Sequence, residues 1–262
     1  MFEYVSTRGE APHLGFCDVT LTGLARDGGL YVPAVVPKLP PAPAGSASFL
    51  KTAERVIPLF VGDDIPADEL KRIIRDAYQK FDHPDIVPLH KLKDNFYILE
   101  LFHGPTLAFK DVALQFLGRV FDFILTTRKQ HVTIIGATSG DTGSSAIEAF
   151  RGKPGVDIFI LHPHGRVSDV QRRQMTTVLD GNVHNIAIEG TFDDCQDLVK
   201  GMFNDEPFRD EMNLSAINSI NWTRILAQVV YYVYAAELIQ QQTDKKAVFS
   251  VPTGNFGNVY AG

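Results

Sequence analysis

Lys110 is the residue of this chain whose surroundings best suit a reactive amine. It lies in the stretch His103-Gly-Pro-Thr-Leu-Ala-Phe-Lys-Asp111, between an expected strand at 96–102 and an expected helix at 111–128 whose apolar residues recur every three or four positions. A lysine at a helix start faces the positive end of the dipole, and its three apolar predecessors would exclude water. Both effects favour the neutral amine, which can form a Schiff base with an aldehyde. The alternative is an ordinary solvated lysine at a helix end.

Two further junctions between an expected strand and an expected helix are rich in glycine and polar side chains. The sequence Gly136-Ala-Thr-Ser-Gly-Asp-Thr-Gly-Ser-Ser145 follows one apolar strand, and Pro252-Thr-Gly-Asn-Phe-Gly-Asn258 follows another. Glycines let backbone amides approach an anion, and a helix N-terminus adds a positive dipole end. Each loop could instead be a plain capping turn. The first matches neither a P-loop nor a dinucleotide-binding motif. A lysine beside two such loops nevertheless favours a phosphate-bearing ligand.

A fourth polar segment runs from His164 to Gln174. Arg166 and Ser168 lie just before an expected helix at 168–179, where they could hold a second anion such as a substrate phosphate. The alternative is a capped helix with solvated arginines.

The histidines and cysteines give no metal or disulfide signal. His162 and His164 lack a third ligand, and Cys17 and Cys195 are far apart in sequence, so no metal site and no disulfide framework are expected. His103 is expected to order the lysine loop by hydrogen bonding.

Composition excludes several classes of protein. With 45% apolar and 21% charged residues, the 262-residue chain is typical of a globular protein, and its net charge of −6 argues against nucleic acid as a partner. The first eight residues do not resemble a signal peptide. The most apolar segment, 225–239, is shorter than a membrane span. A cytoplasmic protein without membrane contact is expected.

The order of elements predicts an α/β fold. The first 90 residues suggest short strands, helices at 18–25, 48–60 and 67–81, and a proline-rich connection that begins at Pro33. From residue 96, strands and helices alternate. The expected strands are 96–102, 132–135, 156–161, 184–188, 214–217 and 247–251, and the expected helices are 111–128, 142–150, 168–179, 193–203 and 222–240. Such repeats predict a parallel sheet covered by helices on both faces, with ligands at the carboxyl ends of the strands.

Taken together, these motifs resemble the threonine synthase family, a group of fold-type II enzymes dependent on pyridoxal 5′-phosphate. The similar motifs are the lysine stretch 103–111, Ala137 to Gly143, Gly165 to Ser168 with Gln171, Gly254 to Asn258, Ser6 to Gly9 and Asp27 to Pro33. The resemblance covers nearly the whole chain. It implies parallel sheets covered by helices in a tryptophan synthase β-like fold. The implied domains are an N-terminal threonine synthase domain at 1–90, a central α/β domain carrying the lysine at 91–220, and the start of a larger cofactor domain at 221–262.

The resemblance also implies roles for individual residues. Lys110 would form the Schiff base with pyridoxal phosphate and move protons. The other residues with an implied role are Gly254, Asn255, Phe256, Gly257 and Asn258 around the cofactor phosphate, Thr138, Ser139, Gly140, Asp141 and Thr142 around the substrate α-carboxylate, and Arg166 and Ser168 as candidates for the substrate phosphate. The implied reaction converts O-phospho-L-homoserine and water to L-threonine and phosphate. The implied partner is thus a small-molecule substrate. The protein is expected to be a monomer or homodimer.

The chain departs from the family pattern at its end. It stops four residues past the last glycine loop, whereas family members continue and supply a hydroxyl residue opposite the pyridine nitrogen. We therefore expect an N-terminal part of the enzyme that binds cofactor poorly and turns over little by itself. Two other functions are compatible with the motifs: another fold-type II lyase, such as a phospholyase or dehydratase, and a non-catalytic phosphate- or nucleotide-binding module.

Overall fold

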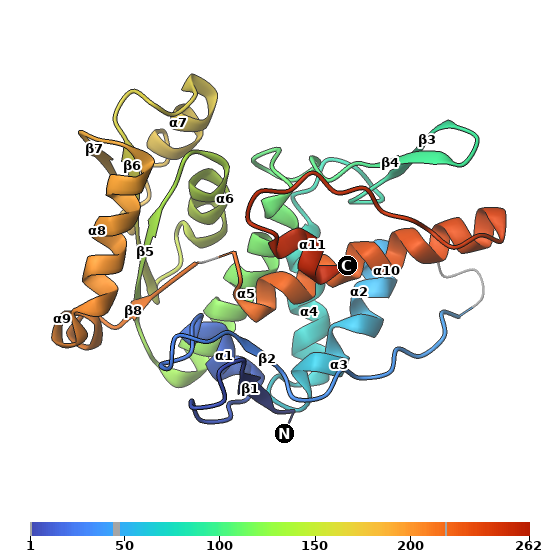
Figure 1. Cartoon of the computed structure of the whole chain (residues 1–262), viewed down its shortest axis with the longest axis horizontal. Helices are drawn as coiled ribbons and strands as arrows, with labels where there is room; N and C mark the ends of the chain where they lie inside the picture. Colours follow the sequence, from blue (N-terminus) through green and yellow to red (C-terminus); the bar gives the residue numbers. More distant parts are fainter. Residues whose placement is uncertain (1, 44–47, 218) are drawn as a thin grey trace.

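A four-stranded parallel sheet with strand order β7-β6-β5-β8 lies at one side of the molecule (Figure 1). The computed structural model describes residues 2–43, 48–217 and 219–262. The sheet and its connecting helices are β5 (Val132–Ala137), α6 (Asp141–Phe150), β6 (Val156–Pro163), α7 (Asp169–Thr176), β7 (Val183–Ile188), α8 (Phe192–Asn204), α9 (Glu206–Glu211) and β8 (Leu214–Ser215). The predicted parallel sheet is confirmed.

Alternate side chains along the strands belong to two different apolar clusters, one on each face of the sheet. Ile134 and Ile158 face a cluster that also contains residues of α6 and Met175 of α7, whereas Ile135 faces a smaller cluster that contains Cys195 of α8. Successive side chains of a strand point to opposite faces, so both faces of this sheet need helices to cover them.

The N-terminal region and the long helices form the other side of the molecule. Its elements are β1 (Tyr4–Ser6), α1 (Phe16–Thr22), β2 (Tyr31–Pro33), α2 (Phe49–Val56), α3 (Pro58–Val61), α4 (Ala67–Tyr78), α5 (Lys110–Arg128), α10 (Trp222–Thr243) and α11 (Gly257–Ala261). Strands β1 and β2 pair antiparallel. Helices α2 and α4 share an apolar core with α5 and α10.

Helix α5 links the two sides because it is buried nearly all round. Phe116 and Val120 belong to the core shared with the N-terminal region, while Leu117 and Phe121 belong to the cluster beneath the sheet. A helix that is apolar on all faces is stable only inside a protein. The position of Lys110, its first residue, is therefore fixed by packing along the whole helix.

Two expected strands are corrected by the structure. The strand expected at 96–102 is shorter, β4 (Phe96–Leu99), and pairs antiparallel with β3 (Leu89–Lys93) as a hairpin separate from the parallel sheet. Asn95 adopts φ +58 in its turn, a conformation that asparagine tolerates better than most residues. The segment 247–251 is not a strand; within the described residues it pairs with no neighbour, and Val248 is 96% exposed.

The expected helix at 48–60 is also interrupted. It divides into α2 and α3 at Pro58, whose ring cannot continue the hydrogen-bond ladder of a helix. Helix α9 was not expected, whereas the remaining expected elements are present with ends displaced by a few residues. Nothing in this architecture tests the three domain limits, which remain predictions.

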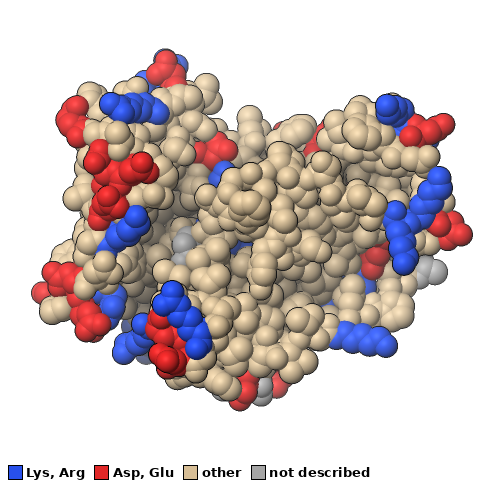
Figure 2. All heavy atoms as spheres, in the orientation of Figure 1, with Lys and Arg blue, Asp and Glu red and all other residues tan. Residues whose placement is uncertain are grey.

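One face of the molecule carries few charges. Figure 2 shows acidic and basic side chains mostly around its margins, with a broad area over α10, α11 and the segment before α11 that carries almost none. Phe256, Val259 and Tyr260 contribute exposed apolar surface there. Among the described helices, none combines the length and hydropathy needed to cross a membrane.

Candidate active site

Lys110 begins α5 and points toward the start of α6. Its side chain is only 18% exposed, and its Nζ lies 4.6 Å from the centroid of the Phe109 ring and 3.4 Å from Asp141 Oδ2. The aromatic neighbour was anticipated as part of an apolar wall, but the ion pair with Asp141 was not. An amine that attacks an aldehyde must be neutral, so Lys110 has to leave this ion pair before it reacts.

Asp111 fixes the loop that carries Lys110. Its fully buried carboxylate accepts hydrogen bonds from Thr106 N (2.7 Å), from Thr106 Oγ1 (2.7 Å) and from Ser145 Oγ of α6. A Cβ on Gly104 would collide with it, so the loop closes tightly around this side chain. Burial raises the pKa of Asp111, and the three donors partly oppose that shift. Its role in holding the loop was not predicted from the sequence.

The loop before α6 leaves two backbone amides for a ligand. Thr138 is buried, and its Oγ1 accepts hydrogen bonds from the amides of Gly140 (3.0 Å) and Gly143 (2.8 Å). The first amides of a helix have no acceptor within the helix. Within the described residues, the amides of Asp141 and Thr142 donate to no protein acceptor, so they can bind an anion. Thr138 thus shapes the loop, while Ser139 is exposed.

Side chains at the start of α7 contact the loop before α6, and through it the loop that carries Lys110. Ser168 caps α7 and donates to Gln171 Oε1 (2.8 Å), and Gln171 Nε2 donates to Asp141 Oδ1 (2.5 Å). Since Asp141 also contacts Lys110, a chain of contacts joins the starts of α5, α6 and α7. A Cβ on Gly140 would collide with the amide of Gln171, which shows how closely the two helices approach.

A second glutamine of α7 reaches the lysine loop directly. Gln174 Nε2 donates to the carbonyl of Thr106 at 3.0 Å. Gln171 was noted only as part of a motif, and Gln174 was missed as a site residue. Their spacing of three puts both amides on one face of a helix, and that signal could have been recognised.

Arg166 is placed apart from this network. It is exposed, and its charge lowers the pKa of Asp194 at the start of α8 as a secondary cause, after the hydrogen bonds from Thr191. Across residues 2–43, 48–217 and 219–262, no hydrogen bond or ion pair joins Arg166 to Lys110 or Ser168. Ser168 is thus linked to Lys110 through the contacts of Gln171 and Asp141, whereas Arg166 has no contact with this network among the described residues.

The loop before α11 is exposed and is shaped by its own side chains. Thr253 Oγ1 donates to Asn258 Oδ1 (2.5 Å), Asn255 Nδ2 donates to Ser219 Oγ (3.3 Å), and Phe256 adopts φ +57. A Cβ on Gly257 would lie 2.7 Å from the carbonyl oxygen of Ser219, so only glycine fits there. Helix α11 packs against α10, but among the described residues no hydrogen bond links this loop to Lys110.

These residues fit pyridoxal phosphate in their donor chemistry. The cofactor has an aldehyde, which requires a primary amine such as Lys110, and a phosphate, which requires backbone and amide donors. Gly254 adds open space, because a Cβ there would meet nothing within 4 Å. The part of the chain that the structure describes holds no cluster of three or more potential metal ligands.

His103, the first residue of the lysine loop, makes hydrogen bonds whose strength depends on pH. Its ring nitrogens lie 2.9 Å from Glu100 Oε2 and 2.8 Å from Asp82 Oδ1, so they join the first residue of the loop to two segments before it; that they order the loop remains a prediction. The hydrogen bond to Glu100, and then the one to Asp82, raises the pKa of His103. A raised folded-state pKa contributes stability below the unfolded pKa of about 6.5, and that stability is lost as pH rises through the folded pKa.

We therefore expect His103→Gln to destabilise the protein only at acidic pH. The loss of unfolding free energy should be up to about 1 kcal/mol near pH 6, because partly exposed ion pairs are screened by solvent, and close to zero near pH 9. Urea unfolding at both pH values measures it. His90→Gln, at an exposed position of β3, serves as the control. An equal loss at both pH values would contradict the role of the charged imidazole.

Comparison with known families assigns both parts of the chain. Residues 3–78 match the family described as threonine synthase N terminus, and residues 83–262 match the family of pyridoxal-phosphate dependent enzymes. Threonine synthase from Pseudomonas aeruginosa is 54% identical over 99% of this chain and 56% of its own length, and that from Schizosaccharomyces pombe is 49% identical over 99% and 53%. The chain thus spans about half the length of the curated relatives it matches.

Solved structures give the same picture. The structure of a pyridoxal-phosphate-bound threonine synthase from Brucella melitensis superposes with a TM-score of 0.91 at 54% identity, covering all of this chain and 57% of that protein. Yeast threonine synthase gives a TM-score of 0.88 at 43% identity, over 99% of this chain and 54% of that one. The fold, the family models and the lysine site agree, and the chain belongs to the family of pyridoxal-phosphate-dependent enzymes.

Proposed function

We propose that this chain provides the lysine, the substrate loops and the N-terminal region of a threonine synthase, which converts O-phospho-L-homoserine and water to L-threonine and phosphate. The observation that carries the proposal is the chain of contacts from Lys110 through Asp141 and Gln171 to Ser168. It gathers a reactive amine and two helix N-termini at one place. The threonine synthases that this chain resembles over nearly its whole length support the choice of reaction.

Lys110 has two tasks in this proposal. Pyridoxal phosphate, when bound, supplies an electron sink that makes the protons of the substrate's carbon skeleton acidic. Lys110 first holds the cofactor and then, as a free amine, accepts and returns protons at its Nζ. Asp141 is the nearest carboxylate to that atom, so it stabilises the ammonium whenever Lys110 carries the proton.

The start of α6 binds the substrate's α-carboxylate in this proposal. Asp141 and Thr142 offer their backbone amides, and Thr138 keeps them in place by holding the amides on either side. The carboxylate of Asp141 would repel a bound anion; Lys110 offsets that charge while the two are paired, and Gln171 Nε2 donates a hydrogen bond to the same carboxylate. Ser139 and Gly140 complete the loop.

The two phosphate groups are assigned to separate loops. We place the cofactor phosphate at Gly254 to Asn258, where α11 begins. We place the substrate phosphate near Ser168 and Arg166, at the start of α7. Ser168 Oγ must then turn from Gln171 toward the ligand, and the exposed guanidinium of Arg166 has room to approach it.

The setting of the enzyme follows from the same proposal. A biosynthetic enzyme of this class acts on a small-molecule substrate, and we propose that it does so in the cytoplasm as a monomer or homodimer. Nucleic acid and membrane are not partners in this proposal, in line with the net charge of −6.

Product analysis of the native protein tests the reaction. With phosphohomoserine, phosphothreonine and threonine offered separately, only the first should react, and it should yield threonine and phosphate in equal amounts. Elimination from phosphothreonine or deamination of threonine would instead establish a phospholyase or dehydratase. A protein that turns over none of the three and shows no cofactor absorbance would be a binding module.

A further inference from the structure

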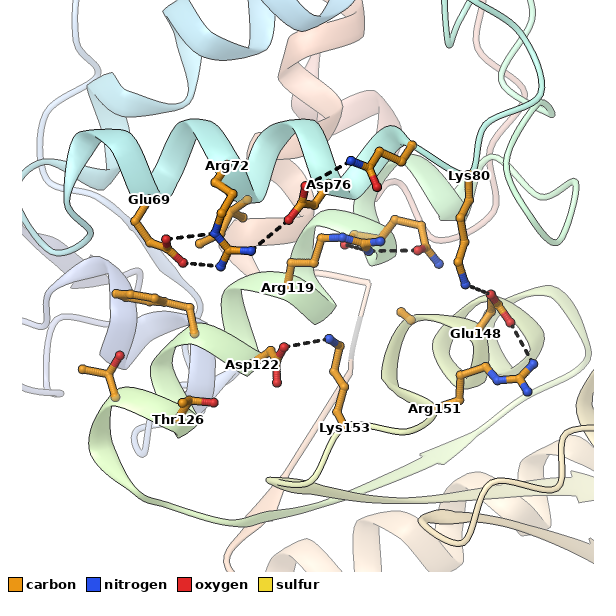
Figure 3. A pocket seen from close by; sticks show the side chains of 16 residues that line it. Glu69, Arg72, Asp76, Lys80, Arg119, Asp122, Thr126, Glu148, Arg151 and Lys153 are labelled. Carbon is orange, nitrogen blue, oxygen red and sulfur yellow. Dashed lines mark hydrogen bonds and ion pairs between the residues drawn. The ribbon is translucent and has the colours of Figure 1, made fainter.

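A cavity of about 580 Å³ lies between α4, α5 and α6. None of the residues assigned to the lysine site lines it. Its lining runs along α5 from Gln115 to Thr127 and includes the C-terminal end of α6, whereas the lysine site lies at the N-termini of both helices. Figure 3 shows Arg119 of α5 in the middle of its lining, with charged side chains of all three helices around it. The volume is within the range of sites that hold small metabolites.

The charged side chains around Arg119 neutralise one another. The ion pairs are Arg72 with Glu69 (2.5 Å) and Asp76 (2.9 Å), Lys153 with Asp122 (3.1 Å), and Lys80 and Arg151 with Glu148 (2.7 and 3.3 Å). Each of the four carboxylates that line the cavity is therefore already engaged by a cation other than Arg119.

Arg119 forms no ion pair with a carboxylate of the described residues. Its Nη1 donates to the carbonyl oxygen (3.0 Å) and to Oε1 (3.1 Å) of Gln115, one turn earlier, and among the described residues no carboxylate lies within 4 Å of the guanidinium. Burial is the main cause of a lowered pKa for Arg119, but an arginine stays protonated in proteins. Asp76, Asp122 and Glu148 oppose this shift from a distance, but within the described residues none of them lies within 4 Å, so the cavity contains one positive charge without an ion-pair contact.

Gln115 adds a buried donor without an acceptor. Its side chain is 1% exposed, and within the described residues Nε2 has no hydrogen-bond partner. Exchanging the oxygen and nitrogen of this amide would break the hydrogen bond that Oε1 accepts from Arg119. A buried polar group without a partner destabilises the protein, so a ligand that supplies an acceptor recovers that energy.

The floor of this cavity is rigid. Gly118, next to Arg119, lies so close to α6 that a Cβ would come within 2.5 Å of the carbonyl oxygen of Ala149. This close approach fixes α5 against α6, and both Arg119 and Ala149 line the cavity. A site whose donors are held before binding loses little conformational entropy when a ligand arrives.

We propose that this cavity binds a small oxyanion, a phosphate or carboxylate group of a metabolite, through Arg119 and Gln115. Of the five cations in the lining, four pair with carboxylates, Arg151 also with Asp180 outside the lining, and among the described residues Arg119 alone has no ion-pair partner. An anion with two or more oxygens satisfies Arg119 and Gln115 Nε2 together. The occupant contacts the helix that begins at Lys110 without touching the lysine itself.

Calorimetric titration of the native protein, saturated with pyridoxal phosphate, tests this site. The probes are inorganic phosphate and succinate, which separate a phosphate from a carboxylate ligand. We expect one of them to bind, and Arg119→Gln to weaken that binding about tenfold or more, because a hydrogen bond to a charged group contributes about 1.5–3 kcal/mol. Arg75→Gln removes the same charge from an exposed position outside the cavity and should bind like the wild type.

Gln115→Met keeps the test independent of whether Arg119→Gln folds. Methionine has a similar shape but no donor, so this variant should also lose affinity while keeping the charge of Arg119. Phosphate could also bind at the lysine site, and the comparison between Arg119→Gln and Arg75→Gln removes that contribution. Equal binding by all folded variants, or no binding of either probe at millimolar concentration, would overturn the proposal.

Discussion

In the native protein, Lys110→Ala should abolish borohydride-dependent labelling by pyridoxal phosphate and lower turnover of phosphohomoserine by about a thousandfold or more. Alanine provides neither the amine that holds the cofactor nor the group that moves protons, and a positioned acid or base alone contributes about 10²–10⁴-fold. Mass spectrometry after reduction should find a phosphopyridoxyl group on Lys110 of the wild type and none in the variant. Steady-state assays of phosphate release measure the lost activity.

Lys71→Ala is the matched control for this experiment. Lys71 is an exposed lysine on α4, so its loss should change neither labelling nor turnover. A phosphopyridoxyl group that persists in Lys110→Ala would move the Schiff base to another lysine. If the variant loses its label but keeps its activity, the assignment of proton transfer to Lys110 is wrong, although the cofactor site stands.

The elements around Lys110 were predictable because their signals are local. Apolar residues at helical spacing predicted α5, and short β-branched runs followed by glycine predicted β5 with α6. The strand expected at 247–251 failed because a strand also needs a partner, which local sequence does not reveal. The hairpin of β3 and β4 was missed for the same reason, since its apolar run could equally fit a parallel sheet.

The partners of Lys110 were less predictable than its position. Asp141 and Gln171 lie 31 and 61 residues further along the chain, so their contact depends on how α6 and α7 pack beside each other on one face of the sheet. The motifs placed Asp141 in a ligand loop and Ser168 at a helix start, but not their connection to the lysine. Arg166 and Ser168 looked equivalent in sequence, yet only Ser168 joins the network.

Asp111→Ala is expected to lower the free energy of unfolding by about 3 kcal/mol and to reduce activity as well. Alanine leaves Thr106 and the fully buried Ser145 without their acceptor, and each buried donor left unpaired costs about 1–3 kcal/mol. The loop from Gly104 to Phe109 then loses the side chain around which it closes, so Lys110 is held less firmly. Chemical denaturation measures the stability, with Asp63→Ala, at an exposed position, as the control.

Asp111→Asn separates the hydrogen bonds from the charge. Asparagine keeps one oxygen as an acceptor for Ser145 but presents an amide to Thr106 N, so it should be destabilised less than Asp111→Ala. Because burial raises the pKa of Asp111, the folded wild type binds its proton more tightly than the unfolded chain, and its stability falls as pH rises from about 3.8 through the folded pKa. Asparagine has no such dependence, so its deficit relative to the wild type should shrink over that pH range. A deficit that grows with pH instead would mean that the three donors hold Asp111 as a stabilised carboxylate, and that its charge, rather than its shape, orders the lysine loop.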